Sequence, residues 1–442
     1  MPSADPKPPV PLEIIIVGAG IAGLSAAIAC RRAGHNVSIY ERRSLNNELG
    51  AAIHVCPNAS RGLLAWGLDP VGARFVKVKH SFRAKGTTLE KFATSDDSYI
   101  ESTFGAPWFF AHRVDLHEEL KRLATEYDAE GKPAKVHLES AVQSYDTEKG
   151  SVTLKNGRTV TGDLVIAADG VHTGAVEAIL GAPNPAIPTT HYNFAYRFLI
   201  PTSDIAADPV TADFLENDDG AMKFYVGDGH RLVWYPCRNN LEHNFVAIFH
   251  NDEEVSHEDW HTPVDQETLV ERYSDFHPKL LAVLRKAKEV KQWPLLYRAP
   301  ISTWHKEKLV LIGDAAHPML PHQGQGGAQA IEDAVALGMV LSNCPVESIP
   351  ARIKIWEELR IKRASVLQVF SNAGQDEPQK IHVEAAKLIG DENVPKTQED
   401  FFKYNFGYDV VKDTTQAMAA QFPAWELPEN FFQSKPGEGV YP

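Results

Sequence analysis

Three glycines near the start of the chain have a spacing that suits phosphate binding. Gly18, Gly20 and Gly23 lie between an apolar, β-branched run and a helical segment, in the stretch VGAGIAGLSAAIA. In Gly-x-Gly-x-x-Gly between a strand and a helix, the first glycine allows a tight turn and the second lets the backbone approach a pyrophosphate. The third lets the helix and the strand pack closely. The N–H groups at the helix N-terminus then face the phosphates.

An acidic residue follows at the distance that a dinucleotide requires. Glu41 ends the second expected strand, 37–40, where a carboxylate binds ribose hydroxyls roughly 20 residues after the glycines. Because a carboxylate repels a ribose 2′-phosphate, the pattern favours an adenosine ribose with free hydroxyls, as in NAD or FAD. The alternative is a purely structural turn, but the strand, the helix and the terminal acid together favour dinucleotide binding.

A second glycine-rich loop occurs late in the chain. The stretch LIGDAAHPMLPHQGQGGAQAIEDA runs from an apolar strand to a helical segment and contains Asp314, Gly324, Gly326 and Gly327. NAD alone does not require this second unit, whereas the ribityl chain and flavin ring of FAD extend beyond the first motif. We therefore expect Asp314 to bind a ribityl hydroxyl. The glycine N–H groups would face the pyrimidine edge of the flavin, where negative charge gathers on reduction.

One motif suggests a metal site, which we reject. His257, Glu258 and His261 have the His-Glu-x-x-His spacing of zinc proteases. Pro263 would stop any helix two residues later, and no third ligand stands at the usual downstream spacing. A solvated acidic loop explains the stretch, so we predict no metal.

The composition is that of a folded protein with more than one domain. The chain has 442 residues, of which 43% are hydrophobic and 23% charged. Its net charge of -14 argues against broad attraction to nucleic acid or to an anionic membrane. No apolar run approaches the roughly 20 residues of a spanning helix. The four scattered cysteines match no metal or redox spacing and suggest a reducing compartment, so we expect a cytoplasmic protein.

Hydrophobic patterning indicates the elements that position these residues. Strands are expected at 12–17, 37–40 and 309–312, and helices at about 113–127, 326–343 and 351–372. Asn156-Gly157 predicts a hairpin with a two-residue turn, whose returning strand ends in Asp169-Gly170. Between about 186 and 300, stretches such as MKFYVG and RLVWYPCR alternate in hydrophobicity, which predicts a mostly antiparallel sheet with one covered face.

These motifs together carry a family resemblance. The chain resembles the single-component FAD-dependent aromatic hydroxylases (group A flavoprotein monooxygenases), and in particular their salicylate hydroxylase-like branch in bacteria and fungi. The resemblance covers roughly residues 12–372. It is carried by GAGIAG with Glu41, by DLVIAADG, and by GDAAHPMLPHQGQGG, with support from HRVDL, GAAIHVCPN and YRAPISTWHKEKLVLIGDAAH.

The resemblance implies a fold and its domains. We expect an α/β protein in which a Rossmann-like FAD-binding domain of the glutathione-reductase type is interleaved with a mostly antiparallel β-sheet substrate domain. The expected boundaries are a disordered tail at 1–11, the FAD-binding domain at 12–185 and 300–375, the substrate domain at 186–299, and a C-terminal extension at 376–442.

The resemblance also implies cofactors and the residues that bind them. Besides bound FAD it implies NADH or NADPH as a transient reductant without a Rossmann domain of its own, and O₂ as cosubstrate. The protein would be a monomer or homodimer with a small aromatic substrate. Asp169 matches the position that serves both FAD and nicotinamide binding. The positions that match the family's FAD contacts are Glu41, Arg42, Ala52, Arg113 and Asp314. For Arg113, at a helix start, the alternative is a solvated arginine.

The implied reaction is hydroxylation of a phenol or hydroxybenzoate-type aromatic through a flavin C4a-hydroperoxide, with or without loss of a carboxylate. A phenolate ring attacks the distal oxygen better than a phenol does, so a nearby cation or base would help. Arg197 and Tyr235 match positions that hold the phenolate in fungal relatives. His322, beside Pro321 whose backbone should face the flavin, is a candidate for proton transfer or substrate contact. The alternatives are a structural arginine, a core tyrosine and a packing histidine.

The chain departs from the family pattern at three positions, and other functions stay open. Val176 stands where an arginine is usual, Thr173 replaces a serine, and Phe198 follows Arg197 where a glycine is common, which could reshape the substrate pocket. The alternatives are a monooxygenase of secondary metabolism (epoxidation or dearomatisation), a flavin reductase without oxygen insertion, and a non-catalytic carrier. A carrier would not need an intact flavin cradle, and the chain has no Trp-x-Trp-x-Ile halogenase signature.

Overall fold

The computed structural model describes residues 10–44, 51–127, 130–189, 193–251, 262–373 and 378–433. The zinc-protease-like spacing at 257–261 and nearly all of the expected N-terminal tail lie outside these ranges.

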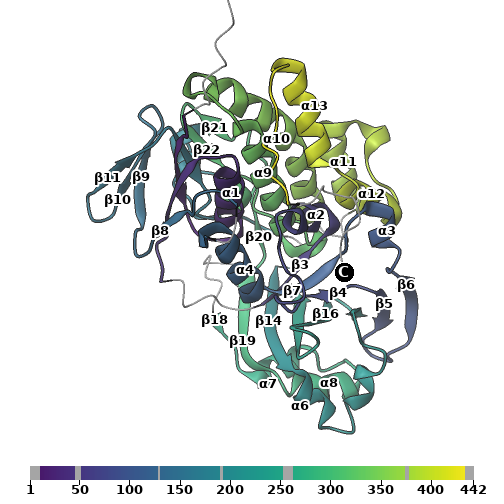
Figure 1. The fold of residues 1–442 in the computed structure, drawn as a ribbon. Helices are drawn as coiled ribbons and strands as arrows, with labels where there is room; N and C mark the ends of the chain where they lie inside the picture. The colour runs from purple at the N-terminus through teal and green to yellow at the C-terminus, as the bar shows by residue number, and fades with distance from the viewer. Residues whose placement is uncertain are drawn as a thin grey trace, which may run out of the picture.

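A mostly parallel sheet forms the centre of one half of the molecule (Figure 1). Its central strands are short runs rich in Ile, Val and Leu that are buried on both faces, as parallel strands between helices require. Across the described residues the order is β21 (His305–Lys306), β22 (Leu309–Leu311), β12 (Leu164–Ala167), β1 (Glu13–Val17), β2 (Asn36–Tyr40) and β8 (Lys135–His137). All neighbours are parallel except β21 and β22. The carboxyl ends of β1, β2, β12 and β22 therefore meet at one edge, where ligands bind in such sheets.

Helices cover this sheet. Helix α1 (Ile21–Arg32) packs against α9 (Gly326–Leu341) so closely that a Cβ on Gly338 would lie 2.5 Å from the Cβ of Ala29. The other helices of this half are α2 (Pro57–Ala65), α3 (Ile100–Phe104), α4 (Arg113–Thr125), α5 (Ala175–Leu180) and α10 (Ile349–Ala373). As expected, α4 buries Leu116, Leu120 and Leu123 and begins at Arg113.

The hairpin around Asn156-Gly157 differs from the expectation in two ways. Strands β10 (Ser151–Leu154) and β11 (Thr159–Thr161) pair with Thr153 opposite Thr159, and Leu154 donates to the carbonyl of Arg158. The connection is therefore a three-residue loop with Gly157 at φ +83°, not a two-residue turn. The chain then changes sheets: β11 stays with β10 and β9 (Val142–Asp146), whereas β12 enters the parallel sheet and leads to Asp169.

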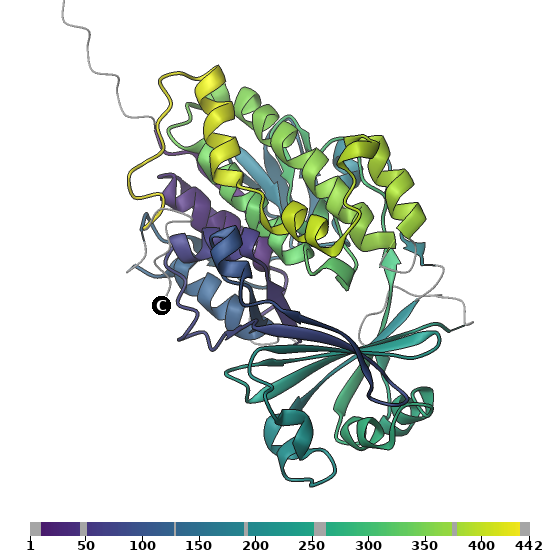
Figure 2. The ribbon, with the colours of Figure 1, turned by 90° about the vertical axis from the view of Figure 1, so that its right-hand side faces the viewer.

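The second half of the molecule is built on a large antiparallel sheet (Figure 2). In the described chain its order is β18 (Thr262–Pro263), β19 (Lys288–Pro294), β14 (Phe194–Pro201), β17 (Glu242–Phe249), β16 (His230–Cys237), β15 (Ala221–Val226), β5 (His80–Lys85) and β6 (Lys91–Asp96). Strands β5 and β6 come from residues before 186, and β5 joins β15 in parallel. The sheet is thus mostly antiparallel, as expected, but it draws on two separate parts of the chain.

One face of this sheet is covered by α6 (Thr202–Ala206), α7 (Gln266–Arg272) and α8 (Pro278–Leu284), with a short 3-10 turn, η2 (Ala212–Leu215). Phe198, Trp234, Phe245 and Leu280 pack there in a second hydrophobic core. The opposite face, which carries Arg197, Val246 and Tyr235, is turned toward the first half of the molecule.

Smaller elements connect the two halves. Strands β3 (Ala52–Val55), β7 (Phe109–His112) and β4 (Val76–Lys77) form one sheet, and β13 (Ile187–Pro188) pairs with β20 (Leu296–Tyr297). The short turns are η3 (Gly313–Ala315), η4 (Pro321–Gln323), η5 (Val346–Ser348) and η6 (Asp391–Asn393). The C-terminal extension forms α11 (Pro378–Ile389), α12 (Gln398–Phe406) and α13 (Val410–Gln421).

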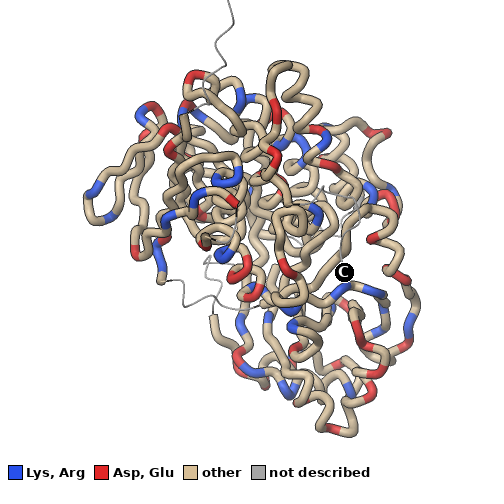
Figure 3. The backbone as a smooth tube through the Cα atoms, in the orientation of Figure 1, with Lys and Arg blue, Asp and Glu red and all other residues tan. Residues whose placement is uncertain are grey.

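Charged residues of both signs are interspersed over the two halves (Figure 3). All four cysteines are buried and none forms a disulfide. Among the described helices, none combines the length and the apolar character needed to cross a membrane.

Candidate active site

A cavity of about 1490 Å³ lies between the edge of the parallel sheet and the uncovered face of the large sheet. It exceeds the roughly 300–1,000 Å³ of typical small-molecule sites, so it has room for more than one ligand. Of the expected site residues, Gly23 alone does not line it. The residues that do are Gly18, Gly20, Glu41, Arg42, Ala52, Arg113, Asp169, Arg197, Tyr235, Asp314, Pro321, His322, Gly324, Gly326 and Gly327.

The three glycines of the first motif are needed for different reasons: two for the packing of the fold, and one for space beside the cavity. A Cβ on Gly18, which has φ +96°, would lie 2.5 Å from the carbonyl oxygen of Ala168, and a Cβ on Gly23 would lie 2.0 Å from that of Gly18. These two glycines allow the strand and helix to pack. A Cβ on Gly20 would meet no described atom within 4 Å, because that backbone faces the cavity. Of these three glycines, only Gly20 leaves room in the cavity for a ligand to approach the backbone.

Two carboxylates at this end of the cavity follow β2 and β12, the strands on either side of β1. Glu41, after β2, accepts hydrogen bonds from the backbone N–H groups of Ala19 and Arg43, each 2.8 Å long. Asp169, after β12, accepts one from the Tyr145 hydroxyl at 2.7 Å. Burial raises the pKa of Asp169, and its Oδ1 has no hydrogen-bond partner among the described residues. A buried acceptor without a partner is what a ligand hydroxyl or amide would satisfy.

The second glycine loop forms the middle of the cavity. Asp314 follows β22 and is accessible within the cavity, although the surrounding protein raises its pKa through desolvation. A Cβ on Gly326 would lie 3.9 Å from Oδ1 of Asp314, so the start of α9 lies beside this carboxylate. A Cβ on Gly327 would lie 3.0 Å from Cδ1 of Ile53, and Gly324 has φ +62°. At its three glycines the loop thus presents backbone to the cavity, which His322 of the same loop also lines.

A buried polar network, which the sequence did not indicate, holds the middle of α9. Arg360 on α10 pairs with Asp333 at 3.0 Å and also with Glu332, and Arg363 pairs with Glu332 at 2.9 Å. Asp333 in turn accepts a hydrogen bond from the backbone N–H of Gly313 at 3.0 Å. The two acids and Arg360 have no exposed surface. The network therefore ties α9 to the turn that carries Asp314.

The large sheet contributes two of the expected catalytic residues at a single point. The hydroxyl of Tyr235 donates to the carbonyl oxygen of Ala52 at 3.2 Å, and a guanidinium nitrogen of Arg197 donates to the same oxygen at 3.3 Å. Arg197 also lies over Trp293, 4.8 Å from the ring centroid. Its Nε is buried without a partner among the described residues, and burial lowers its pKa. Burial raises the pKa of Tyr235.

His54, on β3, is a cavity residue that the sequence reasoning missed. Its ring lies 4.8 Å from that of Tyr235 and 5.5 Å from that of Trp108. Burial lowers its pKa to about 4, so the imidazole is neutral at pH 7. The signal for it in the sequence is the histidine inside GAAIHVCPN, a stretch that supports the family resemblance. His322 is also neutral at pH 7, because burial, aided by Arg231, lowers its pKa to about 3.

The departures from the family pattern have different outcomes. Phe198 does not reshape the cavity: it stacks on Phe245 with ring centroids 5.0 Å apart, in the core on the other face of the sheet. The expectation was wrong because successive strand residues point to opposite faces, and Arg197 takes the cavity face. Val176 is buried in the hydrophobic core of the half that contains the parallel sheet, so no cation stands there.

Comparison with known proteins identifies the family. The family described as FAD binding domain matches residues 11–365. The chain belongs to this family. An FAD-dependent monooxygenase of Aspergillus candidus, cfoG, is 43% identical over 427 residues, which covers 95% of this chain and 98% of that protein. Hispidin-3-hydroxylase of Neonothopanus nambi is 31% identical over 380 residues, covering 83% and 89%.

A solved structure gives the same fold. Salicylate hydroxylase in complex with substrate aligns with a TM-score of 0.69 at 22% identity, covering 92% of this chain and 98% of that one. The expected aromatic-hydroxylase type of FAD fold is thus confirmed, and the protein is an FAD-dependent monooxygenase. The open surroundings of Gly20 and the unpartnered oxygen of Asp169 fit such a cofactor.

Asp314→Ala tests the ribityl end of this family's cofactor site. We expect FAD affinity to fall by about 10- to 150-fold, since a hydrogen bond to a charged group contributes roughly 1.5–3 kcal/mol. ADP-ribose affinity should be unchanged, because Gly20 and Glu41 remain. The measurement is a titration of the apoprotein with each ligand, and Asp314→Asn, which keeps an acceptor oxygen, should retain more affinity than the alanine variant. Unchanged FAD affinity in Asp314→Ala would remove this residue from the cofactor site.

Proposed function

We propose that the protein hydroxylates a phenol or a hydroxybenzoate-type aromatic. FAD would be its bound cofactor, NADH or NADPH its reductant, and O₂ its cosubstrate. The observation that carries the proposal is the meeting of Arg197 and Tyr235 at the carbonyl of Ala52, on the cavity wall beside the flavin cradle. Reduced FAD supplies the chemistry that activates O₂ for transfer of one oxygen atom to an electron-rich ring.

Arg197 would favour the phenolate form of the substrate. A guanidinium keeps its charge even where burial lowers its pKa, because its ordinary pKa is far above 7. Its Nε has no partner in the described part of the chain, so a substrate oxygen would satisfy it. A cation beside a phenol lowers the phenol's pKa. Tyr235 stays neutral, and its hydroxyl donates a hydrogen bond to the carbonyl oxygen of Ala52. This bond fixes the tyrosine ring beside the guanidinium of Arg197, which donates to the same oxygen.

Two neutral histidines can accept a hydrogen bond from the substrate's hydroxyl. His54 lies against the Tyr235 ring, and its unprotonated nitrogen can accept a hydrogen bond from a phenolic hydroxyl. His322, next to Pro321 in η4, faces the same cavity from the glycine-loop side. We assign this hydrogen bond to His54 first, because its ring contacts Tyr235, which meets Arg197 at the carbonyl of Ala52.

The cavity walls would keep water from the reacting atoms. His54, Trp108 and Phe110 form a continuous set of ring contacts with Tyr235. Excluding water prevents loss of the activated oxygen as hydrogen peroxide. At the cofactor end, Asp169 with its unpartnered Oδ1 is the candidate that contacts both FAD and the nicotinamide. The relatives that carry a substrate in their names, such as hispidin-3-hydroxylase, support the hydroxylase assignment.

A panel of phenols and hydroxybenzoates tests the proposal. A substrate should stimulate NAD(P)H oxidation and O₂ uptake, and one atom of ¹⁸O₂ should enter the product, as measured by mass spectrometry. Stimulated NAD(P)H oxidation without label in any product would indicate a reductase instead. Labelled epoxide or dearomatised product would indicate the secondary-metabolism alternative.

Arg197→Gln should separate flavin reduction from hydroxylation. The variant should bind FAD and oxidise NAD(P)H, but product per NAD(P)H should fall about 10-fold for each unit by which the bound phenol's pKa rises, because one unit is roughly 1.4 kcal/mol. The missing oxygen should be found as hydrogen peroxide, and higher pH should restore part of the product. Arg272→Gln is the matched control. The guanidinium of Arg272 lies 4.9 Å from the centroid of the Phe249 ring, on the helix-covered face of the large sheet. Arg272 does not line the cavity.

Unchanged coupling in Arg197→Gln would make this residue structural and leave His54, Tyr235 and His322 as candidates.

A further inference from the structure

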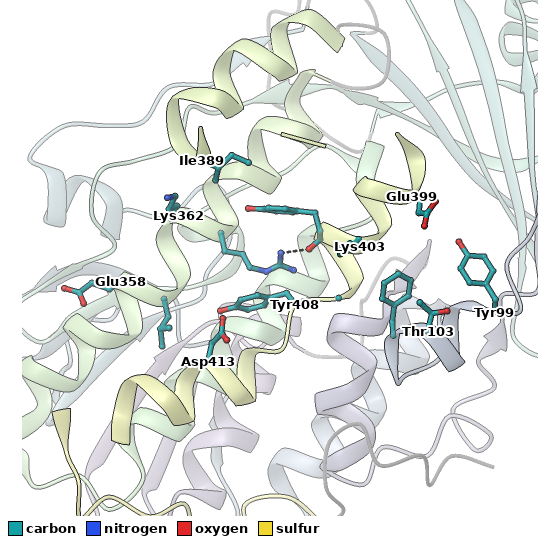
Figure 4. Close-up of a pocket in the computed structure, with 14 residues that line it drawn as sticks. Tyr99, Thr103, Glu358, Lys362, Ile389, Glu399, Lys403, Tyr408 and Asp413 are labelled. Carbon is teal, nitrogen blue, oxygen red and sulfur yellow. Dashed lines mark hydrogen bonds between the residues drawn. The ribbon is translucent and has the colours of Figure 1, made fainter. Parts of the chain in front are cut away.

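Helix α12 separates two hollows. Gln398, Phe401, Phe402, Asn405 and Phe406 line the large cavity. On its other side, Glu399, Lys403, Tyr404 and Gly407 line a groove of about 770 Å³ that it shares with α3, α10 and α13 (Figure 4). Helix α12 alone therefore separates the large cavity from the outer groove at this point. It also lies beyond residue 365, where the match to the FAD-binding family ends.

The cavity side of α12 continues the aromatic lining of the site. Phe402 and Phe406 stack with ring centroids 5.0 Å apart, and both contact Trp108, at 5.9 and 5.2 Å. Trp108 contacts His54, and a Cβ on Gly324 would lie 3.3 Å from His54. Phe402 is thus connected to the glycine loop at Gly324 through two side chains, those of Trp108 and His54. It is only half-buried, although its neighbour Phe406 is 2% exposed, so its ring is open to the cavity.

The carboxyl end of α12 is held firmly by the buried network. Arg363, which pairs with Glu332, donates to the backbone carbonyls of Tyr404 at 2.8 Å and Asn405 at 2.9 Å. The Asn405 side chain donates to Gln323 in η4 at 3.2 Å. At the start of the helix, a capping box between Thr397 and Asp400 satisfies the first N–H groups. Phe402 is therefore presented by a fixed element, which is what a specificity residue requires.

We propose that Phe402 determines substrate size, as the outer wall of the compartment in which the aromatic ring is hydroxylated. The proposal depends on the proposed function, because it concerns the same site. It commits to a flat, one-ring phenol between the Trp108–Phe402 wall and the Arg197–Tyr235 side of the cavity. Removing the Phe402 ring should admit a second ring without altering the groups that bind FAD or the phenolate.

The test compares three probes on the FAD-loaded protein: 4-hydroxybenzoate, 6-hydroxy-2-naphthoate and 4′-hydroxybiphenyl-4-carboxylate. Dissociation constants come from the change in flavin absorbance, and kcat/KM from product formation. In Phe402→Ala, the ratio of two-ring to one-ring kcat/KM should rise about 10-fold or more, the scale on which pocket size discriminates between substrates. Lys403→Ala is the control, because Lys403 is exposed and faces the outer groove; its ratio should stay at the wild-type value.

If the wild-type protein binds the probes and Phe402→Ala leaves the ratio unchanged, the size-selection proposal is overturned. Phe402→Leu serves the same purpose if the alanine variant does not fold, since it keeps apolar contact and removes the ring.

If the wild-type protein binds none of the three probes, the proposed phenol substrate is wrong, and a second readout decides the role of the wall. Iodide quenching of flavin fluorescence needs no substrate. The quenching constant should at least double in Phe402→Ala and stay unchanged in Lys403→Ala. An unchanged quenching constant in Phe402→Ala would show that Phe402 does not shield the flavin from solvent.

Discussion

Gly20→Val should yield a folded protein that does not retain FAD. The Cβ position at Gly20 has no described atom within 4 Å, so the valine side chain should not collide with the protein. That same space is where a pyrophosphate would approach the backbone at the start of α1. We expect flavin occupancy after purification to fall to near zero, with an unchanged far-ultraviolet circular dichroism spectrum. Full flavin occupancy would contradict the assignment of this motif.

Gly23→Val provides the contrast. Its Cβ would lie 2.0 Å from the carbonyl oxygen of Gly18, so this variant should lose stability whether or not FAD is present. Adding excess FAD during thermal unfolding distinguishes the two. FAD raises the melting temperature of the wild-type apoprotein through its binding energy, and should have no such effect on folded Gly20→Val. A folded, FAD-binding Gly23→Val would show that the first turn tolerates a shift of strand against helix.

Arg360→Leu should be among the most destabilising substitutions in the chain. It leaves Glu332 and Asp333 buried with one cation fewer, and breaking a buried pair by removing one partner costs roughly 3–5 kcal/mol. The free energy of unfolding, measured by urea titration, should fall by that amount. The matched control lies on the same helix: Lys354 and Glu358 form an exposed pair at 3.9 Å, and Lys354→Leu should change stability by less than about 1 kcal/mol.

The pH dependence of this effect identifies its cause. Burial alone would raise the pKa of Glu332 and Asp333, but Arg363 and Arg360 lower the pKa of Glu332, and His317 and Arg360 lower that of Asp333. In the wild type these carboxylates therefore stabilise the fold above the unfolded pKa of about 4, and this contribution is lost as pH falls through their folded values.

Without Arg360, we expect desolvation to raise the folded pKa of Asp333 and Glu332 above the unfolded value of about 4. An acid with a raised folded pKa contributes stability that is lost as pH rises. The deficit of Arg360→Leu should therefore be larger at pH 8 than at pH 5. A deficit that is the same at both pH values would indicate lost packing instead of uncompensated charge.

The gathering of the candidate cofactor residues could be predicted from sequence because they follow strand ends. Gly18, Glu41, Asp169 and Asp314 come within three residues of the ends of β1, β2, β12 and β22. Parallel strands bring their carboxyl ends to one edge, so apolar runs followed by Gly or acid suffice to gather them. The glycine spacings supplied the rest of the cofactor interpretation.

The substrate half depended on long-range pairing, which leaves little local signal. Nothing in residues 80–85 indicates that β5 joins β15 in parallel, and nothing in residues 398–406 indicates that α12 faces the cavity. The Arg360 network was equally hidden, because its members come from different helices. The direction of Phe198 was accessible, however: once Arg197 is assigned to the cavity, the alternation of a strand excludes its neighbour.

The pairing of β12 with β22 has a consequence for biosynthesis. Val165 lies opposite Leu309 in the parallel sheet, yet most of the strands of the large sheet are encoded between them. At roughly 5–20 residues per second, the ribosome needs on the order of ten seconds to pass from one strand to the other. During that interval β12 has an unpaired edge, and α1 lacks the α9 surface that covers it. A nascent chain in this state exposes apolar surface to chaperones and aggregation, and FAD can find its complete cradle only after α9 has left the exit tunnel.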